Sequence, residues 1–291
     1  MLKLRQKQDI EYKQRNFQRW RKAFELIDTL WVACEETGRK FNEYMRPQAV
    51  DDRDHVFEAL TYLNSKVLLV SAEMICLMKG GFADGALARW RTIYELNVIA
   101  ALLAQEGEML ARRYLAHSRV QAWERMKLAG DTNDLNLRDL KIKNDAEAAL
   151  AVFGEDMTHF YGWAREITQS KRPNFASIEA LVEHEHGRPL YKAASQHIHS
   201  NHRMPDELLG MSEAVAEGLL VGPSNSGMVT PLRLCAHSLV QSASTLMFRY
   251  PNIDRSAIVL AFVRLARKMD RLAMRIERRT LSTAGKATGL S

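Results

Sequence analysis

Apolar residues recur three and four positions apart along nearly every long segment of the chain, which is the spacing of one face of an α-helix. The alternation of apolar and polar positions that is typical of strands is hard to find. The pattern predicts an all-α protein, a single multi-helix bundle of about eight to ten helices.

Turn and capping residues indicate where these helices begin and end. We expect the first helix to end before Pro47 and the second at Gly80–Gly81, while Asp84 caps the third. Ser177 is expected to cap a short helix later in the chain. The predicted helices cover roughly residues 12–45, 51–80, 84–107, 108–128, 133–147, 177–187, 190–199, 231–250 and 254–280, with a short one at Pro205. The second, third, fourth and penultimate helices should form the core.

Four regions follow from this organisation. Residues 1–50 form a basic N-terminal arm and first helix, and residues 51–250 form the helical core. Residues 251–281 form a basic C-terminal helix, and residues 282–291 are expected to be a disordered tail.

Composition narrows the class of protein. An uncharged apolar run of about 18 residues, as a membrane span requires, is absent, because Glu73 interrupts the longest candidate at Val67–Met78. The first residues also lack the apolar stretch of a signal peptide, so we expect a cytoplasmic protein without a membrane partner. The three cysteines have no metal-binding spacing and are expected to be reduced core residues; they are Cys34, Cys76 and Cys235.

Charge is distributed unevenly along the chain. The formal net charge is +6, yet residues 1–22 carry eight Lys and Arg against two acids, and residues 255–291 carry nine against two. The intervening residues therefore carry about −7. The basic termini could neutralise the phosphates of RNA or another nucleic acid, or they could be solvated faces that contact the acidic middle or an acidic partner.

Histidines are concentrated in one segment. Five of the nine lie within nineteen residues: His184, His186, His197, His199 and His202. Their spacing matches no closed set of metal ligands, and there is no nucleotide-binding loop or nucleophile elbow elsewhere. We therefore expect neither a metal nor a cofactor.

Two groups of polar residues each share a helix face. Tyr191, Ser195 and His199 recur every four residues, and Arg91 and Glu95 have the same spacing on the third helix among apolar neighbours. A buried Arg and Glu are costly unless they are hydrogen-bonded, and Tyr, Ser and His can satisfy them. The cluster is either a structural network between two core helices or a catalytic cleft suited to proton transfer near a phosphate.

Three segments resemble the bacterial family of unknown function DUF5677: Gly85–Glu95, Arg112–His117 and Tyr191–Ser200. The family has an Arg-x-x-x-Glu pair on an early core helix and a Tyr-x-x-x-Ser-x-x-x-His-x-Ser signature on a later one. The chain matches both except at the final serine, where Asn201 stands. The resemblance covers roughly residues 60–250 and implies an all-helical bacterial protein of unassigned activity.

The chain is also similar, more weakly, to HEPN domains, which are helical bundles that often act as metal-independent ribonucleases. Arg112 and His117 fit the Arg-x4–6-His motif of that group, although Arg113 stands where Asn, Asp or His is usual. The resemblance implies that His117 acts on the 2′-hydroxyl and that Arg112 holds the scissile phosphate, usually in a homodimer. The competing His199 has no arginine four to six residues upstream.

These features support two hypotheses about function. One is a HEPN-like ribonuclease or toxin-type effector of antiviral (phage) defence, with its catalytic residues among those of the two clusters. The other is a non-enzymatic module that binds nucleic acid or assembles with a partner, such as a second copy or an operon-encoded protein.

Overall fold

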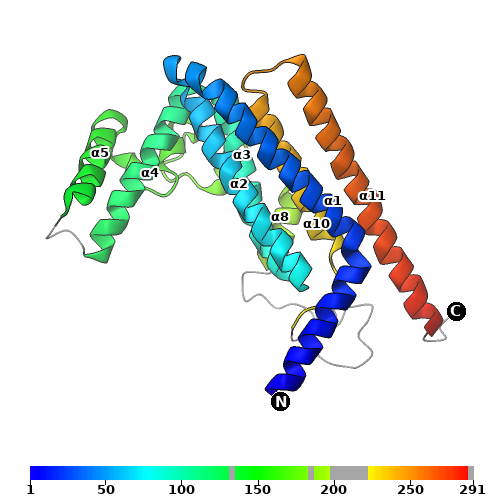
Figure 1. Ribbon diagram of the computed structural model, residues 1–291. Helices are drawn as coiled ribbons and strands as arrows, with labels where there is room; N and C mark the ends of the chain where they lie inside the picture. Colours follow the sequence, from blue (N-terminus) through cyan, green and yellow to red (C-terminus); the bar gives the residue numbers. More distant parts are fainter. Residues whose placement is uncertain (131–134, 183–186, 197–221, 288–291) are drawn as a thin grey trace. The chain divides into compact units, whose positions relative to one another are not determined.

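A computed structural model describes residues 1–130, 135–182, 187–196 and 222–287. This part of the chain contains ten α-helices and two short 3-10 helices, and no strand (Figure 1). The prediction of an all-α protein is confirmed.

The described helices follow one another along the chain. They are α1 (Leu2–Asp51), α2 (His55–Gly80), α3 (Ala83–Glu106), α4 (Glu108–Ala129), α5 (Leu137–Phe153), η1 (Glu155–Thr158), η2 (Gly162–Ala164), α6 (Arg165–Thr168), α7 (Phe175–Glu179), α8 (Arg188–Gln196), α10 (Val229–Met247) and α11 (Ile253–Ala287). Most boundaries agree with the sequence to within a few residues.

Helix α1 is longer than its sequence predicts, since it begins at Leu2 and continues through Pro47 to Asp51. The prediction that it ends before Pro47 is wrong. Met45 and Ala49, on either side of the proline, are both buried, so the apolar stripe continues into the last turn. Burial of these side chains opposes the loss of one backbone hydrogen bond at the proline.

Capping residues differ from the predicted ones at α3 and α7. The Asp54 carboxylate accepts a hydrogen bond from the Phe57 amide at the start of α2, whereas Asp84 lies inside the first turn of α3. Ser177 is the third residue of a capping box in which Asn174 is the N-cap of α7.

The polar segment before Gly154 forms one helix, α5, and not a helix that ends at Glu147.

Helix α11 also exceeds its predicted range. Its backbone is helical to Ala287, beyond the expected end near Thr280, so most of the expected tail over 282–291 is helical. Residues 288–291, the predicted helix at Pro205 and all five clustered histidines lie outside the described residues.

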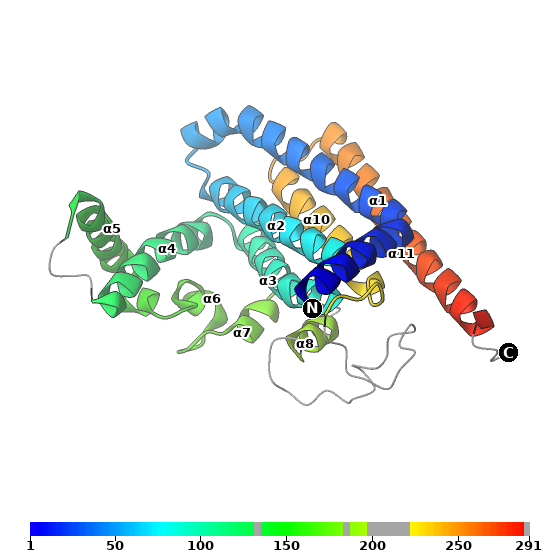
Figure 2. The same cartoon turned by 60° about the horizontal axis from the view of Figure 1, so that its bottom comes forward.

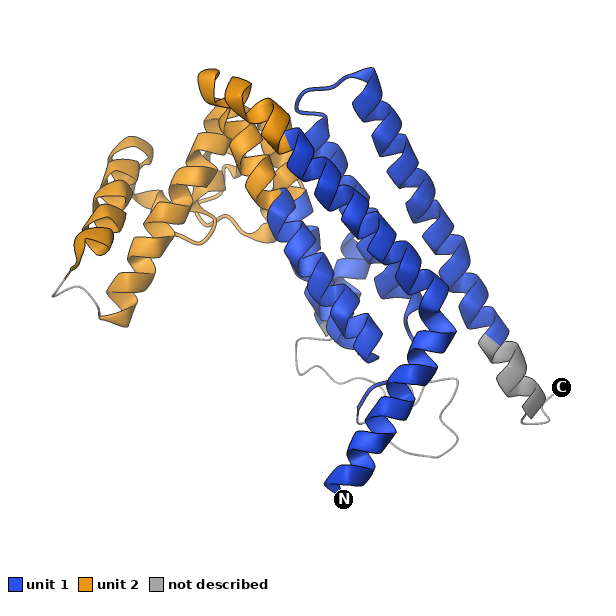
Figure 3. Cartoon of the chain, in the orientation of Figure 1, with its two compact units in different colours: residues 1–41, 64–97, 187–291 blue, residues 42–63, 98–186 orange. Residues whose placement is uncertain are grey.

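Contacts group the chain into two compact units (Figure 3). Unit 1 comprises residues 1–41, 64–97 and 187–291, and unit 2 comprises residues 42–63 and 98–186. Within unit 1, α10 and α11 pack side by side, and within unit 2, α4 packs against α5 (Figure 2). Helices α1, α2 and α3 each contribute residues to both units.

The core of unit 1 depends on α1 more than the sequence suggests. Trp20, Phe24 and Ile27 of α1 are almost completely buried, and Met269 of α11 is buried as well. Helix α4, which we expected in the central bundle, belongs to unit 2. Cys34 and Cys235 are buried as predicted, but Cys76 is exposed.

Among the described residues, α2 is the one helix long and apolar enough to cross a membrane. Of its most apolar window, 44% is buried inside the protein. A core helix passes the same test of length and composition, so this is a weak indication of a membrane span.

Candidate functional site

The residues of the DUF5677-like signature meet at Tyr191, on α8 of unit 1. The Arg91 Nη2 donates a hydrogen bond to the Tyr191 hydroxyl oxygen over 2.9 Å. That hydroxyl in turn donates to the Glu95 Oε1 over 2.6 Å, and the Arg91 guanidinium lies 4.8 Å from the Tyr191 ring centroid. The structure therefore joins three of the five residues that helix spacing predicts to converge.

Burial and charge keep the Tyr191 phenol protonated. Burial raises the pKa of Tyr191, and its hydrogen bond to the Glu95 carboxylate raises it further, against the opposing effect of Arg91. Side chains of Arg91 and Glu95 remain 19% and 32% exposed, so solvent reaches the cluster. The arrangement presents an oriented phenol between a cation and a carboxylate, and the Arg91 guanidinium at this site can bind an anionic oxygen.

Two neighbours that the sequence did not single out position Tyr191. The Tyr94 ring lies 5.2 Å from the Tyr191 ring and 5.3 Å from that of Trp90. A Cβ at Gly187 would lie 2.3 Å from a Tyr94 ring carbon, so only glycine permits this approach at the start of α8. The spacing of Trp90 and Tyr94 on one face of α3 is the signal that could have identified them.

Of the two remaining signature residues, the structure describes Ser195, which bonds within its own helix. The Ser195 hydroxyl donates to the Tyr191 backbone carbonyl oxygen over 2.7 Å, which is a bond within α8. His199 lies outside the described residues, so its catalytic role stays a prediction.

The structure does not bring Arg112 and His117 of unit 2 together. His117 is buried, and its Nε2 donates to the His159 carbonyl oxygen over 2.8 Å. Arg112 is exposed and lines a pocket of about 500 Å³ together with Arg119 and Asp145. Five helical residues separate the two side chains by about 140° around the axis, which explains why a match in spacing does not produce one site.

Burial also removes the charge from His117. It lowers the pKa of this imidazole, and nearby Arg113 lowers it further, while the bond to the His159 carbonyl acts in the opposite direction. His117 is therefore neutral at pH 7 and holds the segment after α5 in place. Arg112 and His117 of one chain therefore do not form the site that the HEPN-like resemblance implies.

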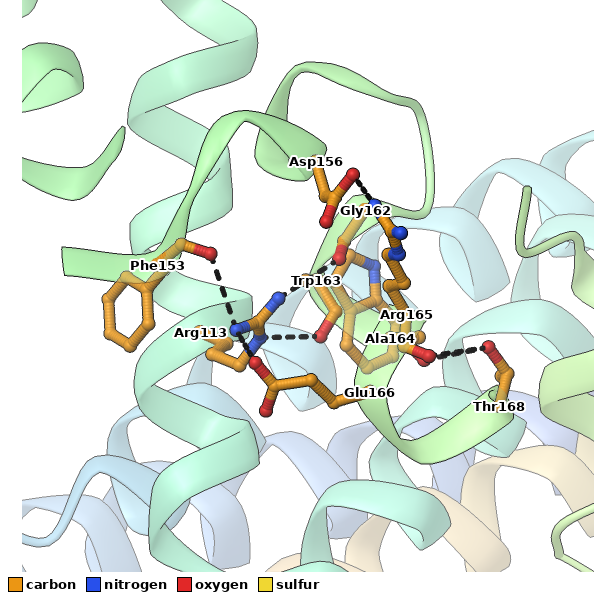
Figure 4. A network of polar contacts seen from close by, with 9 residues as sticks. All are labelled: Arg113, Phe153, Asp156, Gly162, Trp163, Ala164, Arg165, Glu166 and Thr168. Carbon is orange, nitrogen blue, oxygen red and sulfur yellow. Dashed lines mark hydrogen bonds and ion pairs between the residues drawn. The ribbon is translucent and has the colours of Figure 1, made fainter. Parts of the chain in front are cut away.

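Arg113 is the buried arginine of α4, and the sequence identified it only as a departure from the HEPN motif. Its Nε donates to the Trp163 carbonyl oxygen over 3.1 Å and its Nη2 to the Gly162 carbonyl oxygen over 3.3 Å (Figure 4). The Nη1 forms an ion pair with Glu166. A Cβ at Gly162 would overlap the Asp156 carbonyl oxygen, so glycine is required in this loop.

A helical stripe in the sequence could have identified the burial of Arg113. Leu110, Arg113, His117 and Val120 recur at intervals of three and four, and all four are buried. The two polar members satisfy backbone carbonyls of residues 159–163, so Arg113 and His117 are positioning residues for that loop.

A third candidate is the solvent face of α11. Phe262, Ala266, Met269 and Ala273 form its buried stripe. The exposed positions carry six cations that have no ion pair or hydrogen bond among the described residues: Arg264, Arg267, Lys268, Arg271, Arg275 and Arg278. We refer to these six residues as the cationic face.

The two acidic residues in the segment of α11 that carries the cationic face bind side chains of other helices. The Asp270 carboxylate accepts bonds from the Arg233 Nε at 3.0 Å and the His237 Nε2 at 2.9 Å, both on α10. Glu277 accepts a bond from Arg19 of α1 over 2.9 Å. Because neither carboxylate faces the cations, the positive charge of this helix surface is not neutralised.

No group of three or more His, Cys, Asp or Glu side chains that could hold a metal occurs in the described part of the chain. The sites above therefore consist of hydrogen-bonding and charged organic groups, contributed by α3 with α8, by α4 with the loop after α5, and by α11.

These features define an all-α protein with a Tyr-centred polar cluster in one unit, an Arg-centred loop anchor in the other and a cationic terminal helix. The chain belongs to DUF5677, a family of unknown function, whose model matches residues 57–215. No curated protein and no solved structure matches the chain. The match includes the Tyr191 cluster and Arg113, whereas the cationic face lies outside it.

Proposed function

We propose that the protein binds nucleic acid and that the cationic face of α11 is its principal contact surface. The observation that carries this proposal is the segregation of charge on α11. The cationic side chains point to solvent unpaired within the described residues, while Asp270 and Glu277 are bound to α10 and α1.

The spacing of the cations suits a phosphate backbone. Lys268, Arg271, Arg275 and Arg278 recur at intervals of three and four, so neighbouring side chains start about 5–6 Å apart on one helix face. From Arg264 to Arg278 the helix rises roughly 21 Å. Long, flexible side chains at such intervals can contact successive phosphates, and displacement of counterions drives binding.

The test removes three cations from the face without changing the fold. The variant Arg271→Gln, Arg275→Gln, Arg278→Gln should bind a fluorescein-labelled RNA more weakly. The slope of log Kd against log salt concentration should fall by about 2 to 3, which corresponds to three lost phosphate contacts. Fluorescence anisotropy across a range of salt concentrations measures both effects.

A matched control removes the same charge from unit 2. Arg138, Lys141 and Lys171 are exposed and unpaired within the described residues, and their replacement by Gln changes the net charge equally. This variant should retain the affinity and salt slope of the wild type. Equal losses in the two variants would show that only net charge matters and would refute the assignment of the face.

A second candidate function is metal-independent cleavage of RNA at the Tyr191 cluster, as in a toxin-type effector. One observation favours it: the Arg91 and Glu95 side chains beside the Tyr191 hydroxyl remain 19% and 32% exposed, so a phosphate oxygen can approach the guanidinium. In this proposal Arg91 holds a phosphate oxygen, and Tyr191 with Glu95 orients the groups that exchange protons.

Incubation with total RNA, with and without EDTA, tests the second candidate. Cleavage should persist in EDTA and disappear in Tyr191→Phe and His199→Ala, while His117→Ala should not affect the chemistry. RNA that stays intact with the wild-type protein would exclude this candidate and leave the binding function unaffected.

A further inference from the structure

We infer that the protein prefers single-stranded nucleic acid, because a pocket between α1 and α11 can receive an unpaired base. This inference rests on the proposed nucleic-acid binding and specifies its substrate class. The pocket has a volume of about 430 Å³ and lies within unit 1. Phe17 of α1 and Ile276 of α11 supply its apolar walls.

Phe17 has the properties of a stacking platform. It lies at the edge of the buried stripe of α1, three residues before Trp20 and seven before Phe24, and the residue is 50% exposed. Its ring contacts no other aromatic ring or cation among the described residues. Half of the residue's surface is accessible to a ligand. Base–aromatic stacking is the usual way in which proteins hold unpaired bases.

Cations surround this apolar site. Lys22 and Arg21 of α1 line the pocket from one side and Arg279 of α11 from the other. Arg19 also lines the pocket, and its ion pair with Glu277, whose side chains are 10% and 23% exposed, connects the two helices. A pocket with one aromatic wall, one aliphatic wall and a cationic rim fits a base whose flanking phosphates remain in solvent.

The pocket adjoins the cationic face of α11. Arg279 also lines a neighbouring hollow of about 510 Å³, together with Arg271, Arg275 and Arg278. A strand whose phosphates follow the cationic face can therefore place a base against Phe17. A base within a duplex is stacked between its neighbours and cannot enter, so the geometry selects a single strand.

The experiment compares three probes of equal length: a single-stranded oligouridine, the same backbone without bases, and an RNA duplex. Phe17→Ala should raise the Kd for the oligouridine about 5- to 20-fold, within the range of one lost stacking contact. The salt slope should not change, because no cation is removed. Phe17→Trp should retain the wild-type affinity, since it keeps an aromatic face.

Affinity for the abasic strand and for the duplex should be the same in Phe17→Ala and the wild type. The inference is overturned if Phe17→Ala binds oligouridine as tightly as the wild type, or if it weakens all three probes equally. Preferential binding of the duplex by the wild type overturns it as well, yet leaves the proposed function intact. If the triple Arg→Gln variant binds every probe like the wild type, the proposed function itself fails.

Discussion

Replacement of Arg113 by Ala should destabilise unit 2 strongly, whereas the same change at the adjacent Arg112 should not. Arg113 is 4% exposed and donates to the carbonyl oxygens of Trp163 and Gly162. Arg112 is exposed and forms no ion pair among the described residues. The two variants remove the same side chain from neighbouring positions on α4, so they differ only in burial and partners.

The expected magnitude follows from these contacts. Hydrogen bonds from a charged donor contribute about 1.5–3 kcal/mol each, and alanine removes two of them: the bond to the Trp163 carbonyl and the one to the Gly162 carbonyl, which keeps the Arg165 amide as a donor. The Glu166 side chain is 69% exposed, so its ion pair adds little. We expect Arg113→Ala to lower the free energy of unfolding by about 3–5 kcal/mol, which corresponds to the loss of these two charge-assisted hydrogen bonds. Arg112→Ala should change it by less than about 0.5 kcal/mol.

Urea-induced unfolding followed by circular dichroism measures the two differences. Hydrogen exchange measured by mass spectrometry localises the effect, because amides of residues 153–168 should exchange faster only in Arg113→Ala. Comparable stability of the two variants would mean that backbone carbonyls of the loop find other donors. The interpretation of Arg113 as the loop anchor would then be wrong.

Three further results are expected. Tyr191→Phe should lower the free energy of unfolding by about 1–3 kcal/mol, since two charged partners lose their hydroxyl; an unchanged urea midpoint would contradict a structural role for that bond. Burial holds the pKa of His117 below its unfolded value, so the stabilising contribution of the neutral imidazole is complete above about pH 6.5. This contribution is lost as the pH falls through the folded pKa, and the free energy of unfolding then falls by at most about 1.4 kcal/mol per pH unit. His117→Gln, which keeps a donor, should reduce this acid-side loss, and an identical pH profile would refute it. Ellman's reagent should modify only one thiol of the native protein rapidly, that of exposed Cys76. Burial raises the pKa of both Cys34 and Cys235 to about 12, so these thiols should react slowly. Rapid reaction of three thiols would disprove the burial of Cys34 and Cys235.

Much of the local structure could be predicted from the sequence. The spacing of apolar residues indicates the all-α class and most helices, because a period of 3.6 residues is a property of each segment alone. Glycines at 80–81 and 107 end helices where the pattern predicts it. The same periodicity placed Arg91 and Glu95 on one face of α3 and Tyr191 on a face of α8, and hydrogen bonds join them.

Other properties depend on segments that are distant in the sequence. The helical stripe of α4 distinguishes Arg113 from Arg112, but only the segment at residues 153–166 supplies the carbonyls that accept the hydrogen bonds of Arg113. The continuation of α1 through Pro47 depends on burial of Met45 and Ala49, which outweighs a local helix breaker.

The positive charge of α11 is likewise determined partly by the sequence and partly by the tertiary structure. Its excess of Lys and Arg is apparent from composition, but composition cannot tell whether nearby carboxylates neutralise it. Packing against α10 and α1 directs Asp270 and Glu277 inward and leaves the cations in solvent. The sequence thus determined the helices and their faces, because periodicity is local. The tertiary structure alone decided which charges are paired, because pairing depends on residues brought together from distant parts of the chain.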